Sequence, residues 1–77
     1  MNKYSKLGNL SEAFGLEVRK RRLKLKMSQE RFAEIADLHR TYISDIELGK
    51  VDIGLKVAQK LAKALNTQLS KLLKEVK

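Results

Sequence analysis

The chain has 77 residues, which is enough for one small domain with a single core. It contains no cysteine and one histidine, so disulfides and thiolate metal sites are excluded, and neither a metal nor another cofactor is expected. Lysine and arginine number 17 against 9 acidic residues, which gives a net charge of +8 and predicts a polyanionic partner such as nucleic acid, the alternative being a merely well-charged soluble surface.

The sequence also predicts an all-α protein without a membrane segment. No apolar run approaches the roughly 18 residues of a membrane span, and no apolar signal core follows the N-terminus. We therefore expect no membrane partner and a cytoplasmic location. Apolar residues recur at helical spacing almost throughout, and the chain contains no proline.

The N-terminal part is predicted to form an arm followed by a helix. Residues 1–9 are polar and small and predict a flexible arm, which leaves one domain over residues 10–77. A first helix is expected from Ser11, its N-cap, to about Leu25. Its single apolar stripe consists of Leu10, Phe14, Val18 and Leu25.

Two short helices are predicted next. Ser28 is the expected N-cap of a helix over residues 29–36, which buries Phe32, Ala33 and Ala36. Another helix runs from about Arg40 to Leu48, directs Ile43 and Ile46 inward, and stops at Gly49. A turn of three residues separates the two helices, and this geometry is that of a helix-turn-helix. Position 37 in the turn requires a positive φ, which Asp37 tolerates less well than glycine would.

Two further helices complete the predicted domain. A loop over residues 50–54 leads to a helix over residues 55–65, whose apolar face consists of Leu55, Ala58, Leu61, Ala62 and Leu65. Asn66 is suited to the position after that helix. The last helix covers about residues 69–76.

The central segments resemble the XRE family of helix-turn-helix proteins, which share the lambda and 434 repressor type of domain. The resemblance rests on residues 28–33 (SQERFA) and 38–49 (LHRTYISDIELG), extends back to Val18, Arg19 and Arg22, and continues to residues 61–65 (LAKAL) and Leu72. It covers roughly residues 14–73 and implies a compact five-helix fold that binds DNA. Residues 39–44 and the short chain also resemble the controller proteins of restriction-modification systems. Asp37, Ile53 and Gly54 depart from the family's usual glycine, proline and capping serine, and affect local stability and loop conformation rather than function.

In such a domain the N-terminal turn of the third helix enters the major groove. With Ile43 and Ile46 facing inward, its outward set is Arg40, Thr41, Ser44 and Asp45, flanked by His39. Arg40 is suited to donate to a guanine edge, and Asp45 to accept from a cytosine amino group. Thr41 can contact a base, a phosphate or a thymine methyl group. Ser44 is small enough to permit close approach to the DNA.

The other expected DNA contacts have open alternatives. Tyr42 either packs between helices with its hydroxyl on a phosphate or is an aromatic residue at the edge of the core. His39 precedes or caps the helix rather than reading a base. Gln29 resembles the family glutamine that contacts the DNA backbone at a helix N-terminus, and Lys50 is expected to meet phosphate in the same way.

Charged residues outside this helix receive a structural interpretation. The resemblance implies that Arg22 and Glu47 form a partly buried salt bridge between the first and third helices, the alternative being two surface charges. Residues 19–26 contain six cations, which helical geometry spreads around the cylinder, so only Arg19 and Lys26 are candidates for phosphate contacts.

The last helix and the preceding loop predict a homodimer interface. Their clustered apolar residues exceed the needs of one small core and comprise Val51, Ile53, Leu69, Leu72, Leu73 and Val76. The alternative is that they complete the monomer core. A twofold dimer places two recognition helices about 34 Å apart and predicts a roughly palindromic site.

The sequence thus predicts a homodimeric, sequence-specific regulator that binds double-stranded DNA and has no small-molecule ligand. The narrowest hypothesis is the controller of a restriction-modification operon, with a phage-type repressor as a near alternative. An antitoxin-type module that binds a protein partner and touches DNA secondarily is a different class. An enzyme is disfavoured because no catalytic constellation is visible, and an RNA binder because the aromatic residues are not grouped on one surface.

Overall fold

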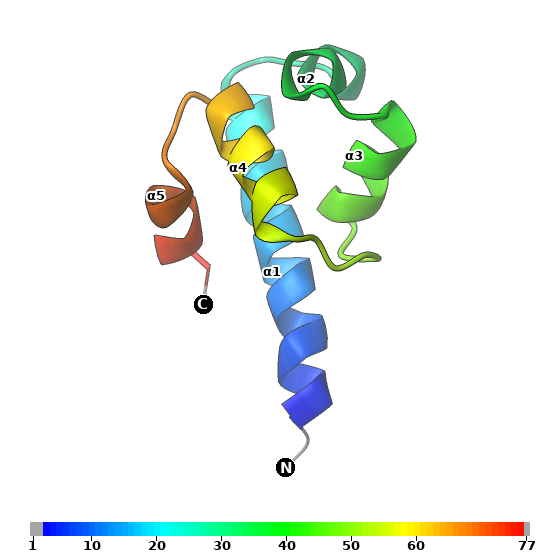
Figure 1. The fold of residues 1–77 in the computed structure, drawn as a ribbon, viewed down its shortest axis with the longest axis vertical. Helices are drawn as coiled ribbons and strands as arrows, with labels where there is room; N and C mark the ends of the chain where they lie inside the picture. Colours follow the sequence, from blue (N-terminus) through cyan, green and yellow to red (C-terminus); the bar gives the residue numbers. More distant parts are fainter. Residues whose placement is uncertain (1–2, 77) are drawn as a thin grey trace.

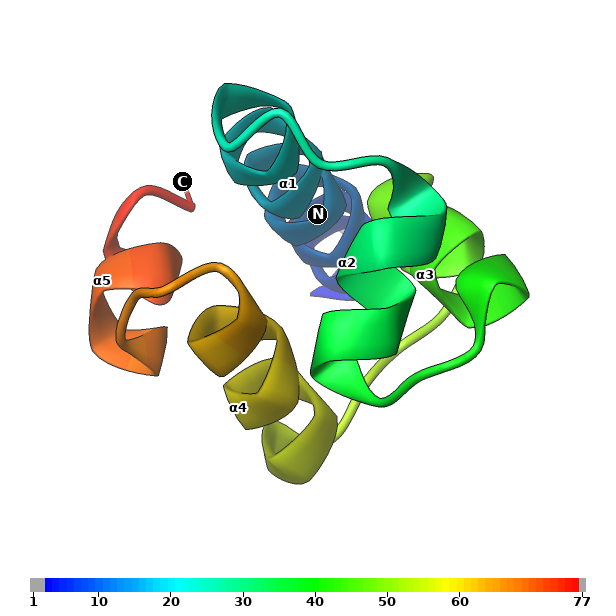
Figure 2. The same cartoon turned by 90° about the horizontal axis from the view of Figure 1, so that it is seen from above.

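The computed structural model describes residues 3–76 of the chain, with side chains from residue 10 onward. This part of the chain folds into five helices: α1 (Lys3–Lys24), α2 (Gln29–Ala36), α3 (Arg40–Glu47), α4 (Leu55–Ala64) and α5 (Leu69–Lys74). The all-α prediction is confirmed. Figure 1 shows α1 as the long central helix with α4 in front of it, α2 and α3 on one side and α5 on the other, and the view from above places α4 across from α1, between α5 and the α2–α3 pair (Figure 2). Within residues 3–76, no helix combines the length and apolar character that crossing a membrane requires.

The core lies where the five helices meet. α1 contacts α3 and α5, and α4 contacts α2 and α5. As predicted, Phe32, Ile43 and Leu61 are among the buried residues, together with Ala33, Ala36, Ile46, Ala58, Ala62 and Leu65. The core also takes Phe14 and Val18 from α1 and Leu72 from α5.

Helices α1 to α4 all end in the same backbone motif. In each, the N–H of a residue in the left-handed region donates to the carbonyl three residues back, and the next N–H donates to the carbonyl five back. The left-handed residues are Lys26, Asp37, Gly49 and Asn66. The stop at Gly49, the strained position of Asp37 and the role of Asn66 are therefore confirmed, whereas Lys26 was not expected there. Ser28 caps α2 as predicted, because its Oγ accepts from the Arg31 N–H at 3.0 Å.

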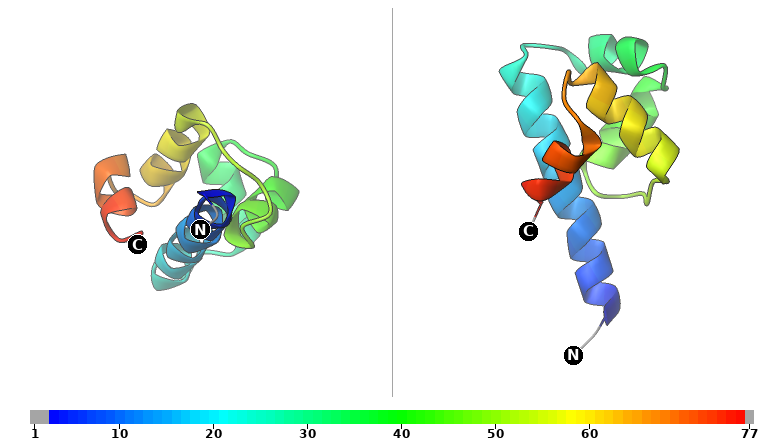
Figure 3. Two further views of the ribbon diagram at one scale, coloured as in Figure 1. Left: turned by 90° about the horizontal axis from the view of Figure 1, so that it is seen from below. Right: turned by 60° about the vertical axis from the view of Figure 1, so that its left-hand side comes forward.

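The prediction for the start of α1 is wrong. The helix begins at Lys3 rather than Ser11, so the expected arm is helical from residue 3 onward, and residues 1–2 lie outside the described part. Ser11 is not an N-cap, since it lies inside the helix and its hydroxyl donates to the Asp52 carboxylate at 2.7 Å. The N-terminal turns of α1 extend past the other helices (Figure 3).

Three leucines assigned to apolar stripes are exposed. Leu10 lies on α1 near the part that has no neighbouring helix, and Leu25 follows the end of that helix. Leu55 is the first residue of α4 and is 78% exposed. Leu25 and Leu55 lie at helix ends, and Leu10 lies where no other helix packs over α1, so sharing a helical face with core residues does not bury these side chains.

Candidate nucleic-acid interface

The exposed edge of α3 begins at its N-terminal turn. His39 caps the helix, and its Nδ1 accepts from the Thr41 N–H at 3.3 Å. Arg40 and Thr41 are exposed, while Ser44 and Asp45 are half-buried at the flanks of the same outward face. The fold therefore brings the four predicted base-reading residues onto one side of α3. Lys50 is exposed just beyond the helix.

The inward face of α3 fixes the direction of this edge. Ile43, Ile46 and Glu47 are buried against the rest of the domain. Tyr42 is half-buried and packs against the hydrophobic core, which places its side chain at the core edge. Packing of the opposite face thus determines which side chains remain on the surface.

Glu47 is buried because it pairs with Arg22 of α1. The Arg22 Nε lies 2.7 Å from Glu47 Oε2, and its Nη2 donates to Glu47 Oε1 at 3.1 Å. Both side chains are nearly inaccessible, with 8% and 2% of their surfaces exposed. The remaining Nη1 donates to the Met27 carbonyl at 2.7 Å. The ion pair implied by the resemblance is therefore present as a two-pronged, enclosed contact between α1 and the end of α3.

Gln29 links this buried pair to the exposed edge. Its Nε2 donates to Glu47 Oε1 at 3.1 Å, and its Oε1 accepts from Arg40 Nη1 at 3.4 Å. A second side chain of α2, Glu30, places its carboxylate 4.0 Å from Arg40 Nε. The sequence predicted only a DNA contact for Gln29 and missed these two protein partners. The signal available was that Gln29 and Arg40 each open a helix of the motif.

The basic run of α1 does not form one surface. Arg22 is buried, and Arg21 pairs with Glu17 at 2.8 Å within the helix. The exposed members are Arg19, Lys20, Lys24 and Lys26. Arg19, Lys20 and Lys24 are spread around α1, and Lys26 follows the end of the helix, so the four cations do not form one surface toward a ligand. Among the described residues, no cluster of three potential metal ligands occurs.

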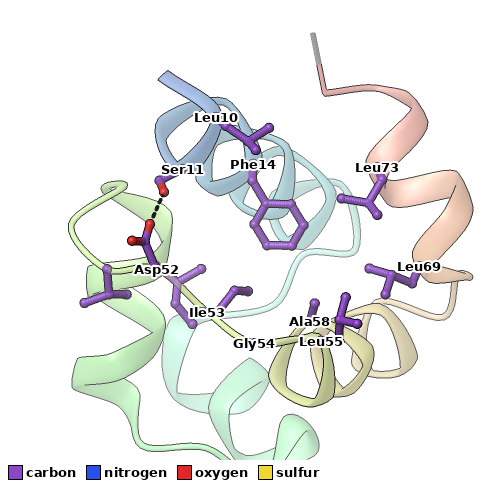
Figure 4. Close-up of a pocket in the computed structure, with 12 residues that line it drawn as sticks. Leu10, Ser11, Phe14, Asp52, Ile53, Gly54, Leu55, Ala58, Leu69 and Leu73 are labelled. Atoms are coloured by element: carbon purple, nitrogen blue, oxygen red, sulfur yellow. Dashed lines mark hydrogen bonds between the residues drawn. The ribbon is translucent and has the colours of Figure 1, made fainter. Parts of the chain in front are cut away.

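A second feature is an apolar pocket of about 370 Å³ between α1, the α3–α4 loop, α4 and α5. Of the predicted dimer residues, Val51, Ile53, Leu69 and Leu73 line it. The Phe14 ring faces into the pocket, and the hydrogen bond between Ser11 and Asp52 closes one side (Figure 4). Leu10 and Leu55 also line the pocket, although the sequence assigned both to helix stripes in the core.

Two of the predicted dimer residues lie elsewhere. Leu72 is fully buried in the monomer core, so its side chain is not available to a partner, and its assignment to the interface is wrong. The reason is that α5 packs on both α1 and α4 and turns Leu72 between them. Val76 is half-buried against the core and does not line the pocket.

Comparison with known proteins places this geometry in context. The profile of a helix-turn-helix family matches residues 18–72. Control protein C.BamHI of Bacillus amyloliquefaciens is 50% identical over 66 residues, which cover 84% of this chain and 82% of that protein. Control protein C.SmaI of Serratia marcescens is 43% identical over 65 residues, covering 84% and 77%. The crystal structure of the restriction-modification controller protein C.AhdI from Aeromonas hydrophila matches with a TM-score of 0.77 and 33% identity, over 79% of this chain and 92% of that one.

Proposed function

Because this chain belongs to the helix-turn-helix family and, within it, to the control proteins of restriction-modification systems, we propose that it binds a roughly palindromic operator as a homodimer. The protein is a sequence-specific DNA-binding transcription regulator rather than an enzyme. Its operator lies upstream of its own operon, and it acts in the cytoplasm, where that DNA is found. Residues 10–77 act as the DNA-binding domain.

The observation that carries this proposal is the outward face of α3. Arg40 and Thr41 are exposed at its N-terminal turn while the opposite face is buried. Such an edge is what a recognition helix presents to the major groove. Arg40 donates to a guanine edge, Thr41 contacts a base or phosphate, and Asp45 accepts from a cytosine amino group and repels bare phosphate. Ser44 leaves room for close approach.

Phosphate contacts set the register of this helix on the duplex. Gln29 and the free N–H groups at the start of α2 face one backbone strand, while Lys50 provides a cation beyond α3. Tyr42 adds its hydroxyl from the core edge. The net charge of +8 increases affinity for any duplex without adding sequence information.

The apolar pocket supports the homodimer. Leu55 and Leu73 are 78% and 44% exposed at its margin, and each protomer thus carries both protruding leucines and an apolar recess. A twofold interface is self-complementary, so the same face can supply both parts. Together with Val51, Ile53 and Leu69, this face forms the interface and sets the two recognition helices about one DNA turn apart.

Fluorescence anisotropy tests the DNA-binding part. The full chain is titrated across a salt series with the duplex upstream of its own gene and with a scrambled duplex of equal length. We expect a preference of about 10³-fold or more for the upstream duplex near physiological salt. Equal, weak binding that collapses as salt rises would contradict the proposal and redirect attention to a protein partner.

Sedimentation equilibrium tests the homodimer. The variant Leu55→Lys places a charge at the pocket margin and is expected to shift the dimer dissociation constant upward by at least about tenfold, since an unpaired charge at an apolar contact is costly. Leu48→Lys is the matched control, because Leu48 is 59% exposed and does not line the pocket. A monomeric wild-type chain, or equal effects of the two variants, would reject this interface.

A further inference from the structure

The middle of α1 contains a glycine at a point of unusually close packing. Gly15 is buried halfway along this 22-residue helix, although glycine weakens helix interiors. Its backbone faces the last turn of α3. A Cβ at this position would overlap the Ile46 carbonyl oxygen and lie 2.9 Å from the Glu47 carbonyl oxygen. The two helices therefore touch backbone to backbone here.

The contact lies next to the only strong side-chain link described between α1 and α3. Glu47 presents its carbonyl to Gly15 and its carboxylate to Arg22, about two turns further along α1. The last turn of α3 is thus seated on α1 at two points. The Gly15 contact sets the separation of the helices, and the ion pair sets their alignment.

From this geometry we infer that Gly15 is a positioning residue for DNA recognition, which rests on the proposed function of α3. The contact atoms on α3 belong to its backbone, so no side-chain rotation can make room for a Cβ. The helix itself must move. Recognition side chains need to be held within about 0.5 Å and 10–20° of their productive geometry. Arg40 begins α3 about 9 Å from Ile46 along the helix axis, so a tilt of α3 at its contact with Gly15 displaces the N-terminal turn that carries Arg40 and Thr41.

The test is Gly15→Ala in the full chain, with Leu16→Ala as the control. Leu16 is the next residue of α1, is 62% exposed and does not line the apolar pocket, so its truncation changes the same helix without touching α3 or the proposed dimer interface. Both variants are titrated with the upstream and scrambled duplexes. We expect Gly15→Ala to reduce the preference for the upstream duplex by at least about tenfold, the size of one lost base contact, while its affinity for the scrambled duplex changes less than about twofold. The control is expected to retain the wild-type preference.

A measurement without DNA tests the positioning role of Gly15 separately from the proposed DNA-binding function of α3. In ¹H–¹⁵N spectra, a displaced α3 shifts the amides of Arg40 and Thr41 and the Arg22 Nε–H resonance. Shifts confined to α1, or an unchanged preference in a folded Gly15→Ala protein, would overturn the inference. A wild-type chain that fails to discriminate between the duplexes contradicts the proposed function instead, and the spectra then decide the role of Gly15.

Loss of folding is also a decisive outcome. If Gly15→Ala is unfolded in buffer, both measurements are repeated with 1 M trimethylamine N-oxide, which favours the compact state. A variant that stays unfolded there would assign Gly15 to folding alone and reject the positioning role.

Discussion

The two ends of α3 are held in very different ways. At the C-terminal end, Glu47 is buried in an ion pair of 2.7 Å, and the backbone rests against Gly15. At the N-terminal end, the polar contacts are longer: 3.3 Å from Thr41 to His39, 3.4 Å from Arg40 to Gln29 and 4.0 Å from Arg40 to Glu30. Arg40 is also half-exposed, so water competes for each of its contacts.

This difference indicates that the C-terminal end of α3 holds the helix in place, whereas its N-terminal end is available to contact DNA. An enclosed ion pair is weakly screened by salt and cannot separate without a large cost in free energy. The Arg22–Glu47 pair therefore fixes the C-terminal end of α3 on α1. Exposed contacts contribute little to stability, so Arg40 can exchange Gln29 and Glu30 for atoms of a base. The helix is thus anchored at one end and free to make new contacts at the other.

The largest expected effect is a loss of stability when the ion pair at the C-terminal end of α3 is broken. Arg22→Ala leaves the Glu47 carboxylate buried without its partner and should lower the free energy of unfolding by about 3–5 kcal/mol. Urea denaturation followed by circular dichroism measures this. Arg31→Ala is the control, because its pair with Glu34 is 61% and 72% exposed and should contribute less than about 1 kcal/mol. Similar losses of unfolding free energy for the two variants would show that the buried Arg22–Glu47 pair stabilises the fold no more than an exposed pair does.

An intermediate effect is expected at the N-terminal turn of α3, and it concerns DNA binding rather than stability. Arg40→Ala should reduce discrimination between the upstream and scrambled duplexes by about 1–3 kcal/mol while the unfolding midpoint stays unchanged. Arg19→Ala removes the same charge from the surface of α1 and should lower the affinity for both duplexes by the same factor. The interpretation fails if Arg40→Ala, like this control, lowers both affinities by the same factor.

The smallest effect is expected at the cap of α3. His39→Ala removes the acceptor for the Thr41 N–H and should cost about 0.5 kcal/mol of stability, the lower limit for a helix cap. Thermal denaturation of the variant beside His39→Asn sharpens the result, since asparagine is a stronger N-cap and should restore or exceed the wild-type midpoint. A loss comparable to that of Arg22→Ala would mean that both ends of α3 are equally anchored.

Local features of the fold could be predicted from the sequence because they depend on neighbouring residues. The bounds of α2, the Ser28 cap and the left-handed residues Asp37 and Asn66 all follow from hydrogen bonds within a few positions. The outward face of α3 was equally predictable, since two isoleucines define its buried side. Resemblance to a family added the Arg22–Glu47 pair, whose partners lie 25 residues apart.

Burial of particular side chains was decided only by the tertiary structure. A helical stripe shows which residues share a face, but not whether another helix covers that face, and so Leu10 and Leu55 are exposed while Leu72 is enclosed. The same holds for contacts that join distant segments. The two partners of Gln29 and the backbone contact at Gly15 arise from how α1, α2 and α3 pack, and packing depends on all three helices at once.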